Sequence, residues 1–228
     1  PDSILARDLS VLITSIQFDE KNDSSALRWL DLMSGCGVRS LRWGLESALS
    51  NNKQASFLRN LEIWVNDSDF NRTDLIKRNL QPLLKKRVSV FFRNDLAQVL
   101  LAKLYLEKLF FDLIDLDCFG CPNAFLQPII QVMAFDGILI LSSSDGRSTT
   151  GHDHAGAIRT LSASTRTRSA SWEIALRFQL AAIARQAWLL GRGVEPLVCF
   201  SEGRTFRIMV RLKRHLALNE EAQLGFIA

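Results

Sequence analysis

The chain has 228 residues, and its 28 Lys and Arg residues outnumber its 24 Asp and Glu residues, so its formal charge is +4. Hydrophobic residues make up 47% and charged residues 23%, a globular composition that excludes collagen, coiled coil and wholesale disorder. At about 150 residues per domain, this length predicts a single domain over residues 1–228, large enough to need no disulfide or metal. Polar residues interrupt every apolar stretch before about 18 residues accumulate, so no membrane-spanning segment and no membrane partner are expected.

The isoelectric point of about 9.1 favours an anionic partner such as nucleic acid, with a merely basic surface as the alternative. The four cysteines are unevenly spaced and no secretory signal precedes them, which predicts reduced thiols and a cytoplasmic location. They are Cys36, Cys118, Cys121 and Cys199. The first residue is Pro1 rather than Met, so the chain is expected to be a fragment or a trimmed form.

Short apolar runs alternate with helical patterns over the first 141 residues. Strands are predicted over residues 26–32, 61–65, 88–92, 110–116 and 137–141, and helices over 38–49, 69–80, 96–108 and 124–134. Asp69 is the expected N-cap of the second helix, and Pro82 its expected stop. Such alternation predicts a mostly parallel sheet with helices on both faces, whose ligands bind at the carboxyl ends of the strands.

This alternation stops after Leu141. Residues 142–171 are rich in Ser, Thr, Gly and Arg, and they predict either a solvated connection or a substrate loop. A helix over 172–191 and an antiparallel pair of strands over 194–201 and 205–212 follow. The predicted fold class is therefore α/β and Rossmann-like, with a mostly parallel seven-stranded sheet, a C-terminal antiparallel strand pair and a short N-terminal segment over residues 1–25.

Polar residues at the predicted strand ends point to a nucleoside cofactor. The first strand runs through Asp31 into a turn in which Gly35 and Gly37 allow close approach of a ligand to the backbone, beside a helix N-terminus. Asp67 ends the second strand and could accept both hydroxyls of a ribose, while Asp95 ends the third and suits an adenine amino group. Each acid could be an ordinary helix N-cap. Three in succession favour NAD or S-adenosylmethionine.

The end of the fourth strand favours methyl transfer. Asp117 is followed two residues later by Phe119, which resembles the Asp/Asn-Pro-Pro-aromatic motif of amino-group methyltransferases. An exocyclic amine on a base is a poor nucleophile, and a carboxylate that accepts its N–H bond activates it as the methyl arrives. The aromatic ring can stack on the base. The alternative is a surface turn with a buried Phe.

Several segments together carry a more specific resemblance. They are ARDLSVL, DLMSGCGVRSLRWG, VNDSDFNRTDLIKRNL, DLIDLDCFGCP, GILILSSSD and GRGVEPLVCFSEGRTFRIMVRLK. In this order, they resemble the tRNA guanine-26 N2-dimethyltransferase family, over residues 1 to about 213. The resemblance implies a class I methyltransferase fold, the cofactor S-adenosyl-L-methionine, the partner tRNA, and a product with one or two methyl groups on the N2 amine of guanosine 26.

The resemblance also implies which residues bind the cofactor. Arg7, in the position of the family's Asn-Arg-Asp motif, and Arg39, after the glycine turn, are expected at the cofactor's carboxylate. Asp67 is expected at the ribose, and Asp95 with Leu96 at the adenine. The turn that holds Asp31, Gly35 and Gly37 completes the expected cofactor set.

For catalysis, the resemblance implies that Asp117 is the base and Phe119 the stacking wall. Cys118 stands where the family has a proline. Family members usually carry a further C-terminal RNA-contacting domain, and this chain is expected to lack one. RNA contacts are expected instead from the 142–171 region, at three arginines. They are Arg147, Arg166 and Arg168.

Two other functions remain open on these residues. One is an inactive relative that only binds RNA, prompted by Cys118 and the missing C-terminal domain. The other is an NAD-dependent oxidoreductase, which the absence of a third glycine after Gly37 disfavours. Cys118 and Cys121 form a C-x-x-C pair that is expected to be coincidental, so no metal is predicted. No obligate protein partner is inferred.

Overall fold

A computed structural model describes residues 4–20, 26–48, 61–86, 88–203 and 205–223. The chain divides into two compact units, Pro1–Asp117 and Cys118–Ala228. Within the described residues, no helix is both long enough and apolar enough to cross a membrane.

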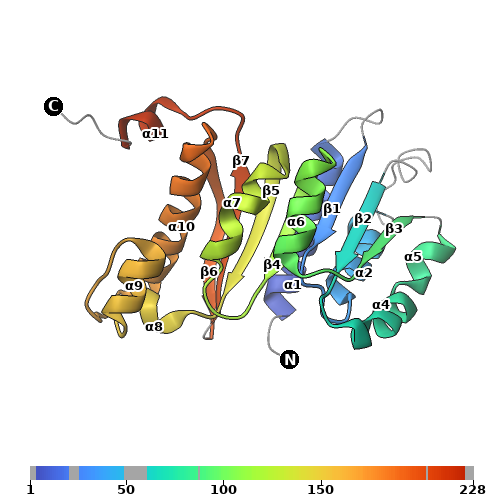
Figure 1. Cartoon of the computed structure of the whole chain (residues 1–228), viewed down its shortest axis with the longest axis horizontal. Helices are drawn as coiled ribbons and strands as arrows, with labels where there is room; N and C mark the ends of the chain where they lie inside the picture. The colour runs from blue at the N-terminus through green and yellow to red at the C-terminus, as the bar shows by residue number, and fades with distance from the viewer. Residues whose placement is uncertain (1–3, 21–25, 49–60, 87, 204, 224–228) are drawn as a thin grey trace. The chain divides into compact units, whose positions relative to one another are not determined.

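The first unit contains four parallel strands, which match the predicted ones within two residues (Figure 1). They are β1 (Leu27–Asp31), β2 (Leu61–Asn66), β3 (Ser89–Arg93) and β4 (Phe111–Asp117), in the spatial order β3-β2-β1-β4. Asp31, the last residue of β1, lies opposite Val65 of β2 and Asp115 of β4. This register brings the carboxyl ends of the three strands to one rim of the unit.

Strands β1, β2 and β4 are mostly apolar because most of their side chains are buried on both sides, whereas β3 is only partly buried. Trp29, Leu30, Ile63, Leu113 and Ile114 are all fully buried. Strands that alternate a solvent face with a core face would show a polar residue at every second position. The continuous apolar runs therefore explain why the sequence alone located these strands.

The helices of the first unit depart from the predictions at two places. They are α1 (Ile4–Glu20), α2 (Val38–Arg42), the π-helix η1 (Trp43–Ala48), the 3-10 helix η2 (Phe70–Arg72), α4 (Thr73–Asn79), α5 (Gln81–Lys85) and α6 (Ala97–Leu106). Asp69 caps η2 by accepting a hydrogen bond from the N–H of Asn71 at 3.0 Å, as predicted. The predicted helix ends at Asn79, ahead of Pro82 as expected, but the short helix α5 follows at once and was not predicted. Pro82 lies in the first turn of α5, where a missing N–H costs nothing.

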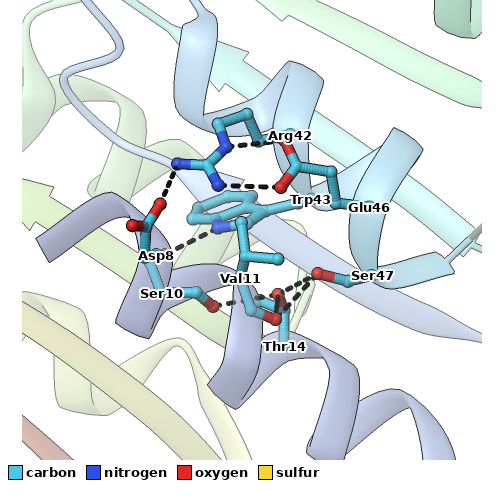
Figure 2. Close-up of polar contacts among 8 residues, drawn as sticks. All are labelled: Asp8, Ser10, Val11, Thr14, Arg42, Trp43, Glu46 and Ser47. Atoms are coloured by element: carbon cyan, nitrogen blue, oxygen red, sulfur yellow. Dashed lines mark hydrogen bonds and ion pairs between the residues drawn. The ribbon is translucent and has the colours of Figure 1, made fainter. Parts of the chain in front are cut away.

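Helix α1 was not predicted, and several polar side chains lie on its buried side (Figure 2). The indole Nε1 of Trp43 donates to Ser10 Oγ at 2.7 Å, and the hydroxyls of Thr14 and Ser47 lie 2.6 Å apart. All four side chains belong to buried residues. These bonds join α1 to η1, and they pair polar groups that would otherwise be costly to bury.

The second unit contains three antiparallel strands, which confirm the predicted C-terminal pair. They are β5 (Met133–Ser143), β6 (Val194–Glu202) and β7 (Thr205–Leu212), in the order β5-β7-β6. The helix predicted to reach residue 134 is α7 (Asn123–Gln131), and β5 begins sooner than expected. Strand β5 pairs with β7 from Gly137 to Ser143. The pairing therefore continues two residues past the predicted strand over 137–141.

The region 142–171 is more ordered than the predicted connection. It contains α8 (Gly146–Thr149) and α9 (His154–Leu161), whose N-termini are capped by Asp145 and Asp153. Gly151 has φ of +92°, and a Cβ there would lie 2.7 Å from the carbonyl oxygen of Thr165. The backbone at 165–167 therefore packs directly on this glycine. Helix α10 (Ser171–Leu189) and helix α11 (Leu218–Gln223) complete the unit.

Candidate functional site

The turn after β1 has the shape predicted from its glycines. Gly35 and Gly37 have φ of +62° and +74°, a region that L side chains rarely adopt. A Cβ on Gly37 would lie 3.4 Å from Ile76 of α4. The N–H of Ser34 donates to the carbonyl of Asn66 at 2.9 Å, so the turn is fastened to the end of β2.

Asp67 braces the same turn from the next strand. Its Oδ2 accepts the N–H of Gly35 at 2.8 Å, and its Oδ1 accepts the N–H of Asp69 at 3.0 Å. The guanidinium of Arg72 lies 3.8 Å from Oδ2, and the Asp67 side chain is 12% exposed. A carboxylate offers about four acceptor positions, so Asp67 keeps acceptor capacity for the hydroxyls of a ribose.

Asn66 joins the second and third strand ends, a role that sequence reasoning missed. Its amide nitrogen donates to the carbonyls of Leu32 and Asp95, both at 3.0 Å, and its oxygen accepts the N–H of Asp95 at 3.0 Å. The Asp95 carboxylate lies 2.6 Å from Lys103 Nζ. Leu96, at the N-terminus of α6, is 63% exposed. An amide that directly follows an apolar strand is the only signal that could have indicated this role.

Asp31 lies beneath the turn and is fully buried. Its Oδ2 accepts the hydroxyl of Ser40 at 2.8 Å, and burial raises the pKa of its carboxyl. Among the described residues, its Oδ1 and the hydroxyl of Ser34 have no hydrogen-bond partner. Buried polar atoms without a partner are uncommon in proteins, and here they lie at the turn that would meet a ligand.

Arg39 connects the turn to the end of β4. Its Nη1 donates to Asp115 Oδ1 at 2.5 Å, and its Nη2 donates to Asp117 Oδ2 at 2.7 Å. Burial alone would lower the pKa of the Arg39 guanidinium, but Asp115, Asp31 and Asp117 together raise it, so the group stays charged. Sequence reasoning considered Asp115 only as a substitute for Asp117. Its position two residues earlier in the strand was the available signal, since such residues share a face.

Phe119 lies in the second unit and is 99% exposed, so the alternative of a turn with a buried Phe is wrong. The next residue, Gly120, has φ of +78°, and its N–H donates to Ser144 Oγ at 2.7 Å. Because the Phe119 ring packs against no part of the core, a stacking partner such as a base could cover it. Cys118, by contrast, is buried.

The remaining predicted residues belong to other segments of the sequence than the strand ends described above. Arg7 is half-buried on α1. Arg147, Arg166 and Arg168 are exposed in the second unit, Arg147 on α8 and the other two in the segment before α10. The first unit therefore brings the predicted turn and acids together at one rim. These residues are Asp31, Gly35, Gly37, Arg39, Asp67, Asp95 and Asp117.

This rim combines the features that a nucleoside ligand requires. The glycine turn allows close approach of a ligand to the backbone, and Asp67 offers a carboxylate. Asp117 is 35% exposed at the tip of β4, where it can accept a proton from a bound substrate. The arrangement fits a nucleoside cofactor and a reaction assisted by a carboxylate.

The comparisons with known proteins point to one family. A family model described as N2,N2-dimethylguanosine tRNA methyltransferase matches residues 1–227. The tRNA (guanine(26)-N(2))-dimethyltransferase of Pyrococcus abyssi is 26% identical over 213 residues, which cover 87% of this chain and 52% of that protein. The enzyme of the same name from Methanosphaerula palustris is 28% identical over 230 residues, covering 100% of this chain and 54% of that protein. The chain thus spans about half the length of these curated relatives.

Solved structures agree on the fold. Trm1 from Pyrococcus horikoshii, solved with S-adenosyl-L-methionine, has a TM-score of 0.78 at 24% identity, over 98% of this chain and 58% of that one. An O-methyltransferase from Bacillus cereus has a TM-score of 0.55 at 14% identity, over 93% of this chain and 81% of that one. The predicted α/β methyltransferase fold is confirmed. Since the family model matches nearly every residue, the chain belongs to the N2,N2-dimethylguanosine tRNA methyltransferase family.

Proposed function

We propose that this chain transfers methyl groups from S-adenosyl-L-methionine to the N2 amine of guanosine 26 in tRNA, giving N2-methyl- and N2,N2-dimethylguanosine. The observation that carries the proposal is the Asp117 carboxylate at the tip of β4, held by Arg39 at 2.7 Å on the same rim as the glycine turn and Asp67. The names of the curated relatives support the choice of tRNA and of guanosine 26.

The residues of the rim fit the cofactor. Asp67 would accept the ribose hydroxyls, while Asp95 and Leu96 would contact the adenine. Gly35 and Gly37 would allow the backbone to approach it closely. Asp31 Oδ1 and Ser34 Oγ, which have no hydrogen-bond partner in the described part of the chain, supply polar atoms at the same turn. Arg7 and Arg39 are the arginines that the family resemblance assigns to its carboxylate.

When bound, S-adenosyl-L-methionine supplies an electrophilic methyl group. In the proposed reaction, Asp117 would accept a hydrogen bond from the guanine amine and take its proton as the amine nitrogen gains the methyl group. The Asp117 carboxylate is 35% exposed, so a substrate amine can reach it, and its ion pair with Arg39 at 2.7 Å fixes its orientation. Phe119 stacks on the guanine and limits the directions from which the amine can meet the methyl group.

The tRNA contacts are proposed for the second unit, at Arg147, Arg166 and Arg168. All three are exposed, and Gly151 holds the backbone at 165–167 close against the turn after α8. Cations on an ordered surface can match the spacing of phosphates better than cations on an irregular chain. A cytoplasmic location belongs to the same proposal, and four free thiols support it.

Methyl incorporation from labelled S-adenosyl-L-methionine tests the proposal. Two unmodified tRNA transcripts, one with guanosine and one with adenosine at position 26, should differ: only the first should gain label. Cofactor binding measured by calorimetry separates the alternatives. Binding of the cofactor without incorporation would favour an inactive RNA-binding relative, and binding of NADH instead would favour an oxidoreductase.

A further inference from the structure

The guanidinium of Arg39 bridges two carboxylates of one strand. Asp115 and Asp117 are two residues apart on β4, so their side chains lie on the same face, while Leu116 between them is fully buried. Arg39 uses one terminal nitrogen for each carboxylate, at 2.5 Å and 2.7 Å. The planar guanidinium has its donors in a fixed fork, which suits two acceptors at this separation.

The two carboxylates differ sharply in their exposure. The Asp115 side chain is 1% exposed and that of Asp117 is 35% exposed, while Arg39 between them is 11% exposed. A buried charge without a partner is strongly unfavourable, so the inner pair stays formed. The inner pair therefore fixes the guanidinium, and the guanidinium in turn fixes the carboxylate that meets solvent.

We propose that Arg39 is a positioning residue for Asp117, anchored by Asp115, and that it holds the Asp117 carboxylate in the orientation needed to accept the proton of the guanine amine. The inference rests on the proposed function. It differs from the role that the family resemblance implies, which is contact with the cofactor's carboxylate. One N–H of each terminal nitrogen of Arg39 donates to an acid of β4, and these two bonds are the observations on which the positioning role rests.

The two roles predict different kinetics. A cofactor contact affects the dissociation constant of S-adenosyl-L-methionine. A positioning contact affects the rate of methyl transfer at saturation, since small errors in orientation can lower a rate by about a hundredfold. Arg39→Lys keeps the charge but replaces the fork with a single flexible ammonium that cannot hold both carboxylates. The variant therefore separates charge from geometry.

A double-mutant cycle measures the coupling directly. Single-turnover rates at saturating cofactor and tRNA should fall about 10- to 100-fold in Arg39→Lys, with the cofactor dissociation constant changed by less than about threefold. In the Asp117→Ala background, Arg39→Lys should cause no further loss, because its effect acts through that carboxylate. The matched control is Arg42→Lys, on the same helix and paired with Asp8 at 2.7 Å, which should keep the wild-type rate.

Three results would overturn the inference in an active wild-type protein. The first is that Arg39→Lys lowers the rate of Asp117→Ala by the same factor as it lowers the wild-type rate. The second is that Arg39→Lys weakens only cofactor binding, and the third is that it leaves the wild-type rate unchanged. If the wild-type chain transfers no methyl group to tRNA, the proposed function itself fails and the inference fails with it.

A second measurement does not depend on activity or on the folding of an Arg39 variant. Nitrogen-15 NMR of the uncomplexed protein should show the two terminal nitrogens of Arg39 as separate signals, because both are held by carboxylates. Asp117→Asn should change the signal of Nη2 while that of Nη1, bound to Asp115, persists. Arg39 signals that are the same in Asp117→Asn and wild type would overturn the inference.

Discussion

Gly35 donates its backbone N–H to the carboxylate of Asp67 over 2.8 Å, which ties the turn after β1 to the end of β2. Asp67 therefore shapes the turn, and in the proposed function it would also offer acceptors to a ribose. The same carboxylate accepts the N–H of Asp69, so its orientation is set by the backbone on both sides.

Replacing Asp67 should weaken cofactor binding. Two charge-assisted hydrogen bonds to a ribose contribute roughly 1.5–3 kcal/mol each, so Asp67→Ala should raise the dissociation constant of S-adenosyl-L-methionine by about a hundredfold or more. Calorimetry measures this change. Asp74→Ala, at an exposed acid on α4, is the matched control and should bind as the wild type does. Equal dissociation constants for the two variants would remove Asp67 from the cofactor site.

Replacing Asp117 should slow the chemical step. Positioned general bases contribute about 10²–10⁴-fold, so Asp117→Ala should lower the single-turnover rate by that factor while the cofactor and tRNA dissociation constants stay close to wild type. Phe119→Ala should instead weaken both alignment and tRNA binding through lost stacking. A near-native single-turnover rate in Asp117→Ala would make its role structural, and Asp115 or a backbone carbonyl would become the candidate base.

The strand ends of the first unit were predictable because parallel strands bring their carboxyl ends to one edge. Acids at the end of an apolar run, or within two residues after it, could therefore be expected at one site from the sequence. Asp67, Asp95 and Asp117 follow that logic. The hydrogen bonds of Asn66 and the bridge from Arg39 to Asp115 could not be predicted, because they depend on side-chain directions that a linear pattern does not contain.

Helix α1 was missed because its buried side is mixed and its exposed side carries apolar residues. Ser10 and Thr14 are buried together with Ile13, whereas Leu5 and Leu12 are about half exposed. A pattern search places the apolar side of a helix against the core, and this helix has no single apolar side for that rule to identify. Helices α8 and α9 were missed for another reason: they are short and polar, and their capping residues Asp145 and Asp153 occur in a stretch that reads as loop.

The polar contact between α1 and η1 should contribute measurably to stability. Ser10→Ala leaves the buried Nε1 of Trp43 without its 2.7 Å acceptor, and an unsatisfied buried donor costs about 1–3 kcal/mol. Asp8→Ala removes only a partly exposed ion pair with Arg42, as seen in Figure 2, and should cost less than about 1 kcal/mol. Urea denaturation compares the free energies of unfolding. Equal losses in the two variants would contradict this account of the helix.

The arginines of the second unit should set the salt dependence of tRNA binding. Replacing Arg147, Arg166 and Arg168 together with Gln should weaken binding and flatten the decline of affinity with salt, because fewer counterions are released. Arg177→Gln is the control, since its guanidinium is paired with Glu173 at 2.7 Å. Gly151→Ala should also weaken binding by displacing the backbone at 165–167. An affinity that survives the triple replacement would place the tRNA contacts elsewhere.

The central claim is that the chain methylates the N2 amine of guanosine 26, and mass spectrometry of nucleosides tests it most directly. Unmodified tRNA would be incubated with the protein and S-adenosyl-L-methionine carrying a deuterated methyl group, and then digested to nucleosides. The account predicts deuterated N2-methylguanosine and N2,N2-dimethylguanosine, both absent when position 26 is adenosine. Label in a different nucleoside, or in guanosine of the adenosine-26 transcript, would contradict the claim, as would tRNA that gains no label while the protein binds the cofactor.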